Sequence, residues 1–386
     1  MFDILTLNKI SACGLNVLDK EKFSVGDDKK NPDGIILRSF NMHDMELPES
    51  LKAIARAGAG TNNIPIDKCT EKGIVVFNTP GANANAVKEM VLAALLLSSR
   101  KIAQGIAWAN TLTGDDVAKQ VEKGKSAFAG PELDGKKLGV IGLGAIGVMV
   151  ANVAYHLGME VMGYDPYISV DAAWGLSRHV EKAVELKTIL EECDYITIHV
   201  PLNAETKAMF DKDAFSIMKP GMRLLNFSRG ELVDNAALKD AIAAGKVACY
   251  VTDFPNAEVI GMENTICVPH LGASTPESED NCARMAAMEL QNFLLEGNIV
   301  NSVNFPTCSM AREGKSRVTI SHKNVPNCLS SFSSLFSKEG INISNMLNKS
   351  KKDLAYTIID VDGDINDVIV DELKALDNVL NVRVIL

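Results

Sequence analysis

The sequence predicts an α/β protein with two Rossmann-like domains, each built on a doubly wound parallel sheet, followed by a small βαββαβ domain. Three observations predict this architecture. Short apolar segments typical of strands alternate with helical segments from residue 4 to residue 268, and this alternation is typical of parallel sheets. One strand runs into a Gly-x-Gly-x-x-Gly turn that opens a helix. From residue 317 to 385 the order changes to strand, helix, strand, strand, helix, strand.

Length and composition indicate a globular protein with ample core. The chain has 386 residues, of which 47% are hydrophobic and 23% charged, so two or three domains are expected. A net charge of -10 argues against nonspecific nucleic-acid binding, which needs a basic surface. The cysteines form no C-x-x-C pair, the histidines show no metal-ligand spacing, and the N-terminus lacks a secretory signal pattern. We therefore expect reduced thiols, a cytoplasmic location and no metal site.

Two long helical patterns organise the domains. Asn83–Ala109 links the two lobes, and its apolar centre, Met90–Leu97, is too short to cross a bilayer. Glu277–Glu296 returns the chain to the first lobe, which is therefore discontinuous. The expected domains are 1–97 with 282–303 for the substrate, 98–281 for the nucleotide, a linker at 304–314, and the last domain at 315–386. The predicted strands are Ile4–Leu7, Gly34–Leu37, Leu51–Arg56 and Gly73–Asn78 in the first sheet, and the run before Gly142, Glu160–Tyr164, Tyr195–Val200, Arg223–Phe227, Ala248–Asp253 and Thr265–Val268 in the second.

The glycine-rich turn predicts a dinucleotide site. Gly142 allows the tight turn, Gly144 lets the backbone approach a pyrophosphate, and Gly147 lets the helix pack on the strand. The helix N-terminus then offers N–H groups to the phosphates. Asp165 ends the next strand, where it accepts hydrogen bonds from a ribose, and no Arg follows it, so NAD is favoured over NADP. The uncharged run Leu138–Leu157 also has the length of a membrane span, but its glycines and the following strand and acid argue against that interpretation.

Three side chains at strand ends carry the expected chemistry. Arg229, Glu258 and His270 each follow a strand of the second sheet, where such folds bind ligands. A guanidinium binds a carboxylate with two hydrogen bonds, and a His beside a carboxylate transfers a proton near neutral pH. With NAD as hydride acceptor, these parts suffice to oxidise an α-hydroxy acid. Taken singly, each residue is more often a turn, core or solvated loop residue, and His199 is interpreted as structural or adjacent to the cofactor.

Five segments, RAGAG, NTPGANANAVKE, GLGAIG, NFSRGELVD and PHLGAST, resemble the D-isomer-specific 2-hydroxyacid dehydrogenases over nearly the whole chain. The resemblance implies that Arg229 binds the substrate carboxylate, that His270 is the catalytic acid–base, and that Glu258 is its partner. It implies a substrate loop at Arg56–Gly60, whose backbone N–H groups meet the carboxylate. The implied cofactor contacts are Gly142, Gly144, Ala145, Ile146, Gly147, Asp165, Val200, Pro201, Thr206, Phe227, Ser228, Asp253 and Gly272. The substrate candidates are Arg56, Ala57, Gly58 and Ala59, with Arg38, Arg56 and Lys88 proposed for a phosphate on charge grounds.

The tail is similar to an ACT domain, a small module that senses amino acids and pairs across a dimer. With it, the resemblance implies oxidation of 3-phospho-D-glycerate to 3-phosphohydroxypyruvate, the first step of phosphorylated L-serine biosynthesis, in a homodimer or homotetramer. His322, Asn324 and Asn342 match the family's serine-binding positions. The usual Pro-Gly of that motif is Pro326-Asn327 here, and Asn tolerates the left-handed backbone that the turn needs. A dimerising module without a ligand is an equal alternative.

Two further interpretations of the function stay open. The same chemistry acts on another D-2-hydroxyacid, such as glycerate with hydroxypyruvate, or lactate. Alternatively, the fold serves a regulatory protein that senses NAD without catalysis, and the ACT-like tail argues against that interpretation. In each case the partner is a small molecule, and neither nucleic acid nor a membrane is expected.

Overall fold

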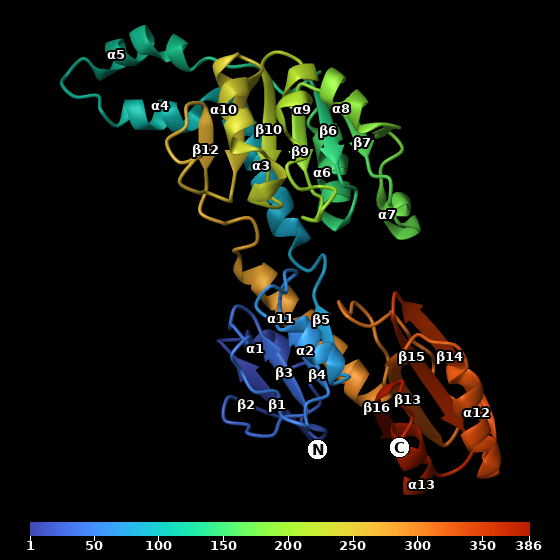
Figure 1. Ribbon diagram of the computed structural model, residues 1–386. Coiled ribbons are helices and arrows are strands. Elements are labelled where there is room, and N and C mark those ends of the chain that lie inside the picture. Colours follow the sequence, from blue (N-terminus) through green and yellow to red (C-terminus); the bar gives the residue numbers. More distant parts are fainter. The chain divides into compact units, whose positions relative to one another are not determined.

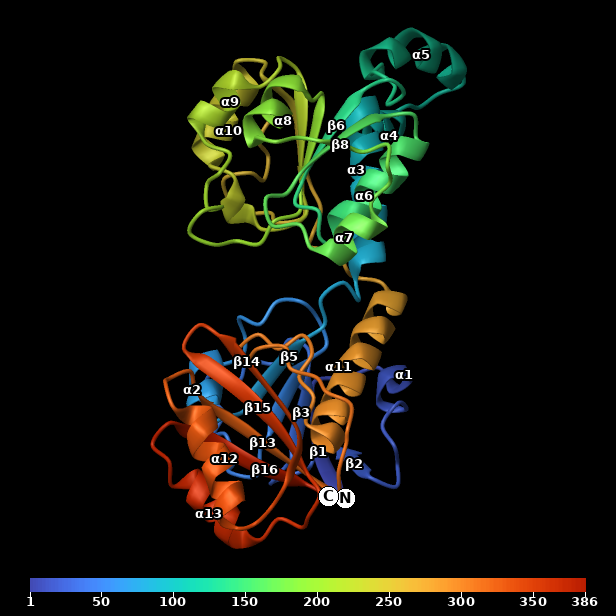
Figure 2. The same cartoon turned by 90° about the vertical axis from the view of Figure 1, so that its right-hand side faces the viewer.

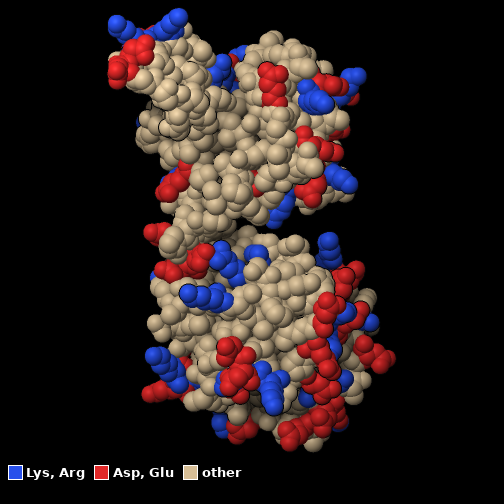
Figure 3. Space-filling view, turned by 90° about the vertical axis from the view of Figure 1, so that its left-hand side faces the viewer, with Lys and Arg blue, Asp and Glu red and all other residues tan.

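A computed structural model describes residues 1–386 and shows two compact units (Figure 1). One unit combines Met1–Asn83 with Pro276–Leu386, and the other is Ala84–Thr275. The first unit is discontinuous, as the long return helix predicted. Over the face drawn in Figure 3, acidic and basic side chains are interspersed.

The discontinuous unit begins with a five-stranded parallel sheet in the order β2-β1-β3-β4-β5. Its strands and short helices are β1 (Phe2–Leu7), α1 (Ala12–Leu15), β2 (Phe23–Gly26), β3 (Gly34–Leu37), β4 (Ala53–Arg56), α2 (Ile66–Glu71) and β5 (Val75–Asn78). The elements α1 and β2 were not predicted, because both are four residues long and too short to show a period. Helix α11 (Pro276–Glu296) starts with a proline, which suits the first helical position, and buries Leu290 and Phe293 against the sheet.

The other unit has a seven-stranded, all-parallel sheet in the order β12-β11-β10-β9-β6-β7-β8. The strands are β6 (Lys137–Ile141), β7 (Glu160–Tyr164), β8 (Glu181–Lys182), β9 (Tyr195–Ile198), β10 (Met222–Asn226), β11 (Val247–Thr252) and β12 (Thr265–Cys267). The chain reverses direction across the sheet between β7 and β9, which both pair with β6. Ligands of doubly wound folds bind at this switch point.

Helices cover both faces of the seven-stranded sheet (Figure 2). On one face, α8, α9 and α10 bury apolar side chains such as Ile189, Phe215 and Leu238. On the other face, α3 and α6 bury Leu95 and Val150. The helices of this unit are α3 (Ala84–Arg100), α4 (Ile102–Ala109), α5 (Val117–Gly124), α6 (Ala145–His156), α7 (Val170–Gly175), α8 (Leu186–Glu192), α9 (Lys212–Ile217) and α10 (Asn235–Ala243), with 3-10 turns at Lys125–Phe128 and Gly230–Leu232.

The prediction of one helix over Asn83–Ala109 is wrong at Lys101. That residue has a left-handed backbone, with φ +45°, and α3 and α4 meet there at 67°. The hydroxyls of Ser98 and Ser99 both donate to Leu95 O, and Arg223 Nε donates to Ser98 O at 3.0 Å. The Ser98 carbonyl lies in the last turn of α3, which ends at Arg100, and Arg223 supplies the donor that such a carbonyl lacks within the helix. No single helix is long and apolar enough to cross a membrane; α3 and α4 meet that criterion only as a bent pair.

The tail is a four-stranded antiparallel sheet in the order β14-β15-β13-β16, with two helices on one face. Its elements are β13 (Ser316–Lys323), α12 (Cys328–Lys338), β14 (Ile343–Lys351), β15 (Leu354–Val361), α13 (Asp367–Lys374) and β16 (Val379–Ile385). The predicted βαββαβ order is confirmed. Asn327 has φ +69° before α12, so the expected left-handed turn forms without glycine.

The opposite face of the tail sheet packs against the end of α11. Tyr356 and Ile358 belong to the same buried cluster as Phe293 and Phe305. The last carbonyls of α11 lack N–H donors within the helix, and arginines of the tail donate to them. Arg383 donates to the carbonyls of Phe293 and Leu294 at 3.2 and 2.9 Å.

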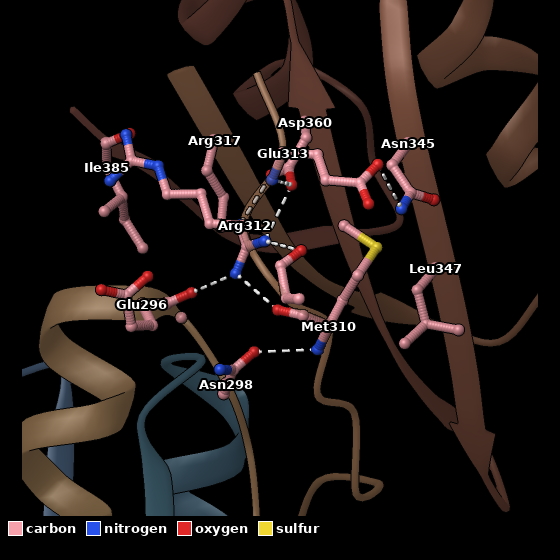
Figure 4. Close-up of polar contacts among 12 residues, drawn as sticks. Glu296, Asn298, Met310, Arg312, Glu313, Arg317, Asn345, Leu347, Asp360 and Ile385 are labelled. Atoms are coloured by element: carbon pink, nitrogen blue, oxygen red, sulfur yellow. Dashed lines mark hydrogen bonds and ion pairs between the residues drawn. The ribbon is translucent and has the colours of Figure 1, made fainter. Parts of the chain in front are cut away.

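Arg317 is the centre of this contact (Figure 4). Its side chain is fully buried and donates to both carboxylate oxygens of Asp360, at 2.6 and 2.8 Å. It also donates to the carbonyls of Glu296, Met310 and Ala311, at 2.8, 3.1 and 3.0 Å. One guanidinium thus joins the tail sheet, the end of α11 and the connecting segment.

Candidate active site

The three glycines after β6 have the roles that their spacing predicts. Gly142 has φ +89°, and a Cβ there would lie 2.6 Å from His199 O. A Cβ on Gly147 would collide with the Gly142 carbonyl oxygen, so the helix could not begin where it does. No atom lies within 4 Å of a Cβ placed on Gly144, which leaves space for a pyrophosphate. Ala145 and Ile146 then open α6, whose first turn presents N–H groups to that space.

Asp165 is fixed beside this turn. It follows β7, and its carboxylate accepts hydrogen bonds from the N–H groups of Leu143 and Tyr167, both at 2.8 Å. Each carboxylate oxygen has a further lone pair for a ribose hydroxyl. The hydrogen bond to Leu143 therefore fixes the position of Asp165 relative to the glycine-rich turn.

The neighbouring strands β9 and β10 bring the next predicted cofactor residues to the same sheet edge. Val200 and Pro201 follow β9, and a Cβ on Gly142 would lie 2.9 Å from Val200 Cγ1. Phe227 and Ser228 follow β10, and Ser228 Oγ donates to Ile198 O at 2.8 Å. The Thr206 hydroxyl is used within its own loop, where it donates to Pro201 O at 2.7 Å.

Asp253 is a buried carboxylic acid at this edge. It is 2% exposed, and Oδ2 accepts from Gly272 N at 3.1 Å. Oδ1 is buried without a hydrogen-bond partner, and burial raises the pKa of this carboxyl. Buried acceptors are normally satisfied, so Oδ1 indicates where a bound molecule donates.

Phe254 brings Arg229 and His270 together. The Arg229 guanidinium carbon lies 5.9 Å from the Phe254 ring centroid, and the His270 ring lies 4.9 Å from it. His270 has a left-handed backbone, φ +46°, and its N–H donates to Asp253 O at 3.1 Å. Phe254 was not predicted as a site residue, although an aromatic residue directly after Asp253 was a signal in the sequence.

Glu258 is not hydrogen-bonded to His270. Its Oε2 accepts from Asn235 Nδ2 at 2.7 Å, and Asn235 is the first residue of α10. The expected acid–imidazole bond is therefore absent from this structure, and Asn235 is a partner that the sequence analysis missed. His199 bonds through Nε2 to Thr197 Oγ1 at 2.9 Å, and burial lowers its pKa to about 3, so it is neutral near pH 7.

The first sheet carries a separate set of candidate residues at the carboxyl ends of its strands. Arg38 follows β3, and Arg56 ends β4. In the turn after β4, Gly58 has φ +147°. Ala57 N donates to Leu37 O and Gly58 N donates to Thr79 Oγ1, both at 2.8 Å. Two of the expected carboxylate donors are thus used internally.

The candidate phosphate-binding cations differ in their surroundings. Arg38 Nη1 lies 2.6 Å from Glu279 Oε1, in the first turn of α11. Lys88 belongs to the other unit, on α3, where Nζ donates to Asn85 Oδ1 at 2.6 Å.

Comparison with known proteins agrees with this geometry, which is typical of an NAD-binding site. Residues 92–272 match the D-isomer specific 2-hydroxyacid dehydrogenase, NAD binding domain. A D-3-phosphoglycerate dehydrogenase of Haemophilus influenzae is 31% identical over 402 residues, covering 98% of this chain and 94% of that protein. The chain belongs to the D-isomer specific 2-hydroxyacid dehydrogenase family.

Other members of the family cover the chain in part. A D-3-phosphoglycerate dehydrogenase of Archaeoglobus fulgidus is 36% identical over 285 residues, 71% of this chain. The chain spans about half of that relative's length, 52%. The crystal structure of an NAD+-bound 3-phosphoglycerate dehydrogenase of Entamoeba histolytica superposes with a TM-score of 0.62 at 27% identity, covering 78% of this chain and 98% of that chain.

The residues of this chain fit the family's cofactor, NAD. The open space at Gly144 suits a pyrophosphate, and the carboxylate of Asp165 suits ribose hydroxyls. The unpartnered Oδ1 of Asp253 suits an amide N–H, such as that of a nicotinamide. All three features lie at the carboxyl edge of one parallel sheet.

In the tail, the three predicted effector residues are engaged internally. His322 is 2% exposed, and its ring bonds to Thr357 Oγ1 and Lys323 O at 2.9 and 2.8 Å. Burial lowers its pKa. Asn324 Nδ2 donates to Lys352 O at 3.1 Å. Asn342 Nδ2 donates to Asp362 at 2.6 Å.

Proposed function

We propose that the protein oxidises 3-phospho-D-glycerate to 3-phosphohydroxypyruvate with NAD, as the first step of phosphorylated L-serine biosynthesis in the cytoplasm. The arrangement of Arg229 and His270 around Phe254, beside the cofactor residue Asp253, carries the proposal. The phosphorylated substrate is supported by the similarity to a D-3-phosphoglycerate dehydrogenase over almost the full length of both chains.

In this mechanism Arg229 binds the substrate carboxylate through its guanidinium. His270 takes the proton of the C2 hydroxyl while the C2–H bond breaks, and the C2–O bond becomes a carbonyl. NAD+ supplies the hydride acceptor. Glu258 leaves Asn235 and stabilises the protonated imidazole. The phosphate is bound by Arg38 and Arg56, with Ala59, Gly58, Ala57 and Lys88 as further substrate candidates.

We further propose that the tail is an ACT-like module in a homodimer or homotetramer. Its βαββαβ order and the left-handed turn at Asn327 support this role. L-Serine would act as an effector only after the hydrogen bonds of Asn324 and Asn342 are exchanged for bonds to the ligand.

A second substrate class has one observation in its favour. Glu279 pairs with Arg38 at 2.6 Å and so compensates one of the two cations on the first sheet. An unphosphorylated D-2-hydroxyacid has no phosphate for such a cation to bind, and its carboxylate is bound by Arg229 in the proposed mechanism.

The test follows NADH absorbance with purified protein and three keto acids in parallel, namely phosphohydroxypyruvate, hydroxypyruvate and pyruvate, each with and without L-serine. A higher kcat/KM for phosphohydroxypyruvate supports the proposed substrate, and inhibition by serine supports the role of the tail. Equal or higher rates on the unphosphorylated acids would keep the mechanism and replace the substrate. No NADH oxidation with any acid would contradict the catalytic proposal.

A further inference from the structure

We propose that Glu279 sets the affinity for the substrate phosphate by competing with it for Arg38. This inference rests on the proposed function, because it concerns the cations that bind the phosphate. Glu279 touches no reacting atom and acts through Arg38, so it is a positioning residue that tunes substrate specificity.

The pair is placed where an incoming anion reaches it. Arg38 directly follows β3, and Glu279 lies in the first turn of α11. Arg38 Nη1 and Glu279 Oε1 are 2.6 Å apart, and the two side chains are 41% and 47% exposed. An exposed pair of this kind exchanges partners at small cost, so a phosphate can replace the carboxylate.

Arg38 and Arg56 both influence a buried thiol one turn further along α11. Cys282 lies one turn after Glu279 and is buried. Burial raises the pKa of its thiol, while the Thr79 hydroxyl and the charges of Arg38 and Arg56 lower it in part. The positive charges of Arg38 and Arg56 thus both influence the beginning of α11, and Glu279 in its first turn pairs with Arg38.

Glu279 opposes phosphate binding in two ways. It occupies the Arg38 donors that a phosphate would use, and its negative charge repels the phosphate dianion at short range. The carboxylate of the same substrate is bound by Arg229 in the proposed mechanism, so an unphosphorylated acid avoids both effects. Glu279 is therefore expected to weaken the binding of phosphorylated acids selectively.

The variant Glu279→Gln keeps the size of the side chain and removes its charge. We expect KM for phosphohydroxypyruvate to fall about three- to tenfold, as is typical for the loss of one short-range charge interaction at an exposed site. The kcat should stay within about twofold, because the reacting atoms are untouched. KM for hydroxypyruvate should also stay within about twofold.

The matched control is Glu192→Gln. Glu192 pairs with Lys137 at 2.9 Å, and its side chain is 48% exposed, close to the 47% of Glu279. Lys137 begins β6, at the end of the strand opposite to the glycine-rich turn at Gly142–Gly147. This control should leave both KM values unchanged. A double-mutant cycle adds Arg38→Gln and Arg38→Gln/Glu279→Gln. The fall in KM for phosphohydroxypyruvate caused by Glu279→Gln should be smaller when Arg38 is absent.

A binding measurement separates this inference from the proposed function. The inhibition constant of inorganic phosphate against hydroxypyruvate reduction reports the cations without a phosphorylated substrate, and Glu279→Gln should lower it. If the wild-type enzyme prefers phosphohydroxypyruvate but Glu279→Gln leaves its KM and the phosphate inhibition unchanged, the inference is wrong and the function stands. A higher KM in Glu279→Gln would also overturn it, because Glu279 would then hold Arg38 in place. If the wild-type enzyme shows no preference and no phosphate inhibition, the proposed substrate fails.

Discussion

Phe254 contacts both side chains that the proposed mechanism needs, with its ring centroid 5.9 Å from the Arg229 guanidinium carbon and 4.9 Å from the His270 ring. An aromatic face attracts a guanidinium and restricts the orientation of a neighbouring ring. Single residues thus hold the candidate side chains in place. Asn235 donates a hydrogen bond to Glu258, and Asp253 accepts hydrogen bonds from the backbone N–H groups of Gly272 and His270.

Replacing His270 by Ala should lower kcat about 10²- to 10⁴-fold, because the C2 hydroxyl loses its general base. NAD affinity should stay within about threefold, since no cofactor contact is assigned to the imidazole. Single-turnover kinetics and NADH fluorescence titration measure the two quantities. A kcat near that of the wild type would remove His270 from the mechanism.

Replacing Gly147 by Ala should weaken NAD binding about tenfold or more, because the new Cβ would collide with the Gly142 carbonyl oxygen and must shift the turn. Gly245→Ala is a matched control for glycine loss, since no atom lies within 4 Å of its Cβ position, although its φ of +71° carries a local cost. Equal NADH affinities in the two variants would contradict the assigned role of Gly147.

At the scale of elements, α11 carries groups with different tasks along its length. Its first turn holds Glu279, its apolar face covers the first sheet, and its last carbonyls bond to the tail. Glu289 is buried on this helix, with Oε1 accepting from Asn301 Nδ2 at 2.7 Å and Oε2 unpartnered. Burial raises its pKa from 4.5 to about 8.

The raised pKa of Glu289 makes a pH-dependent cost. Between pH 4.5 and 8 the folded protein retains a proton that the unfolded chain releases, so stability falls as pH rises through this window. Glu289→Gln removes that cost, and we expect it to stabilise the protein by about 1–2 kcal/mol at pH 7.5. Urea unfolding at pH 7.5 and 5.0 measures the effect. The gain should shrink at pH 5.0, and an equal gain at both values would contradict the explanation.

At the scale of the whole molecule, the tail and the first sheet form one unit. Tyr356 and Ile358 share a buried cluster with Phe293 and Phe305. The buried Arg317–Asp360 pair bonds to the carbonyls around the end of α11. We therefore expect the tail to unfold together with the first sheet, in one cooperative transition.

Arg317→Met should destabilise this unit by about 3–5 kcal/mol, because it leaves the fully buried Asp360 carboxylate without its cation. Arg317→Met/Asp360→Leu should recover much of that loss, since no buried charge remains. Urea unfolding and hydrogen exchange in β13 and β3 report whether tail and sheet open together. A loss below about 1 kcal/mol in the single variant would show that the contact is not an important link.

The sequence was sufficient to predict the elements whose local pattern is long or distinctive. Parallel strands, the βαββαβ tail and the glycine turn with Asp165 are set by hydrophobic period and by steric limits on glycine, and these act over a few residues. The break at Lys101 escaped prediction, because no proline or glycine marks it in the sequence.

Only the tertiary structure decided which side chains meet. The chain positions of Arg229, Glu258 and His270 marked them as candidates, but not their partners: Phe254 contacts His270 from the segment after β11, and Asn235 contacts Glu258 from α10. The sequence likewise predicts the tail as a separate domain. Its contact with α11 through Arg317 depends on a buried ion pair with Asp360 that forms only in the folded structure. The physical reason is the distance along the chain over which each effect acts. Periodicity and backbone strain depend on neighbouring residues, whereas contacts between distant segments form only when the whole domain folds and buries its core.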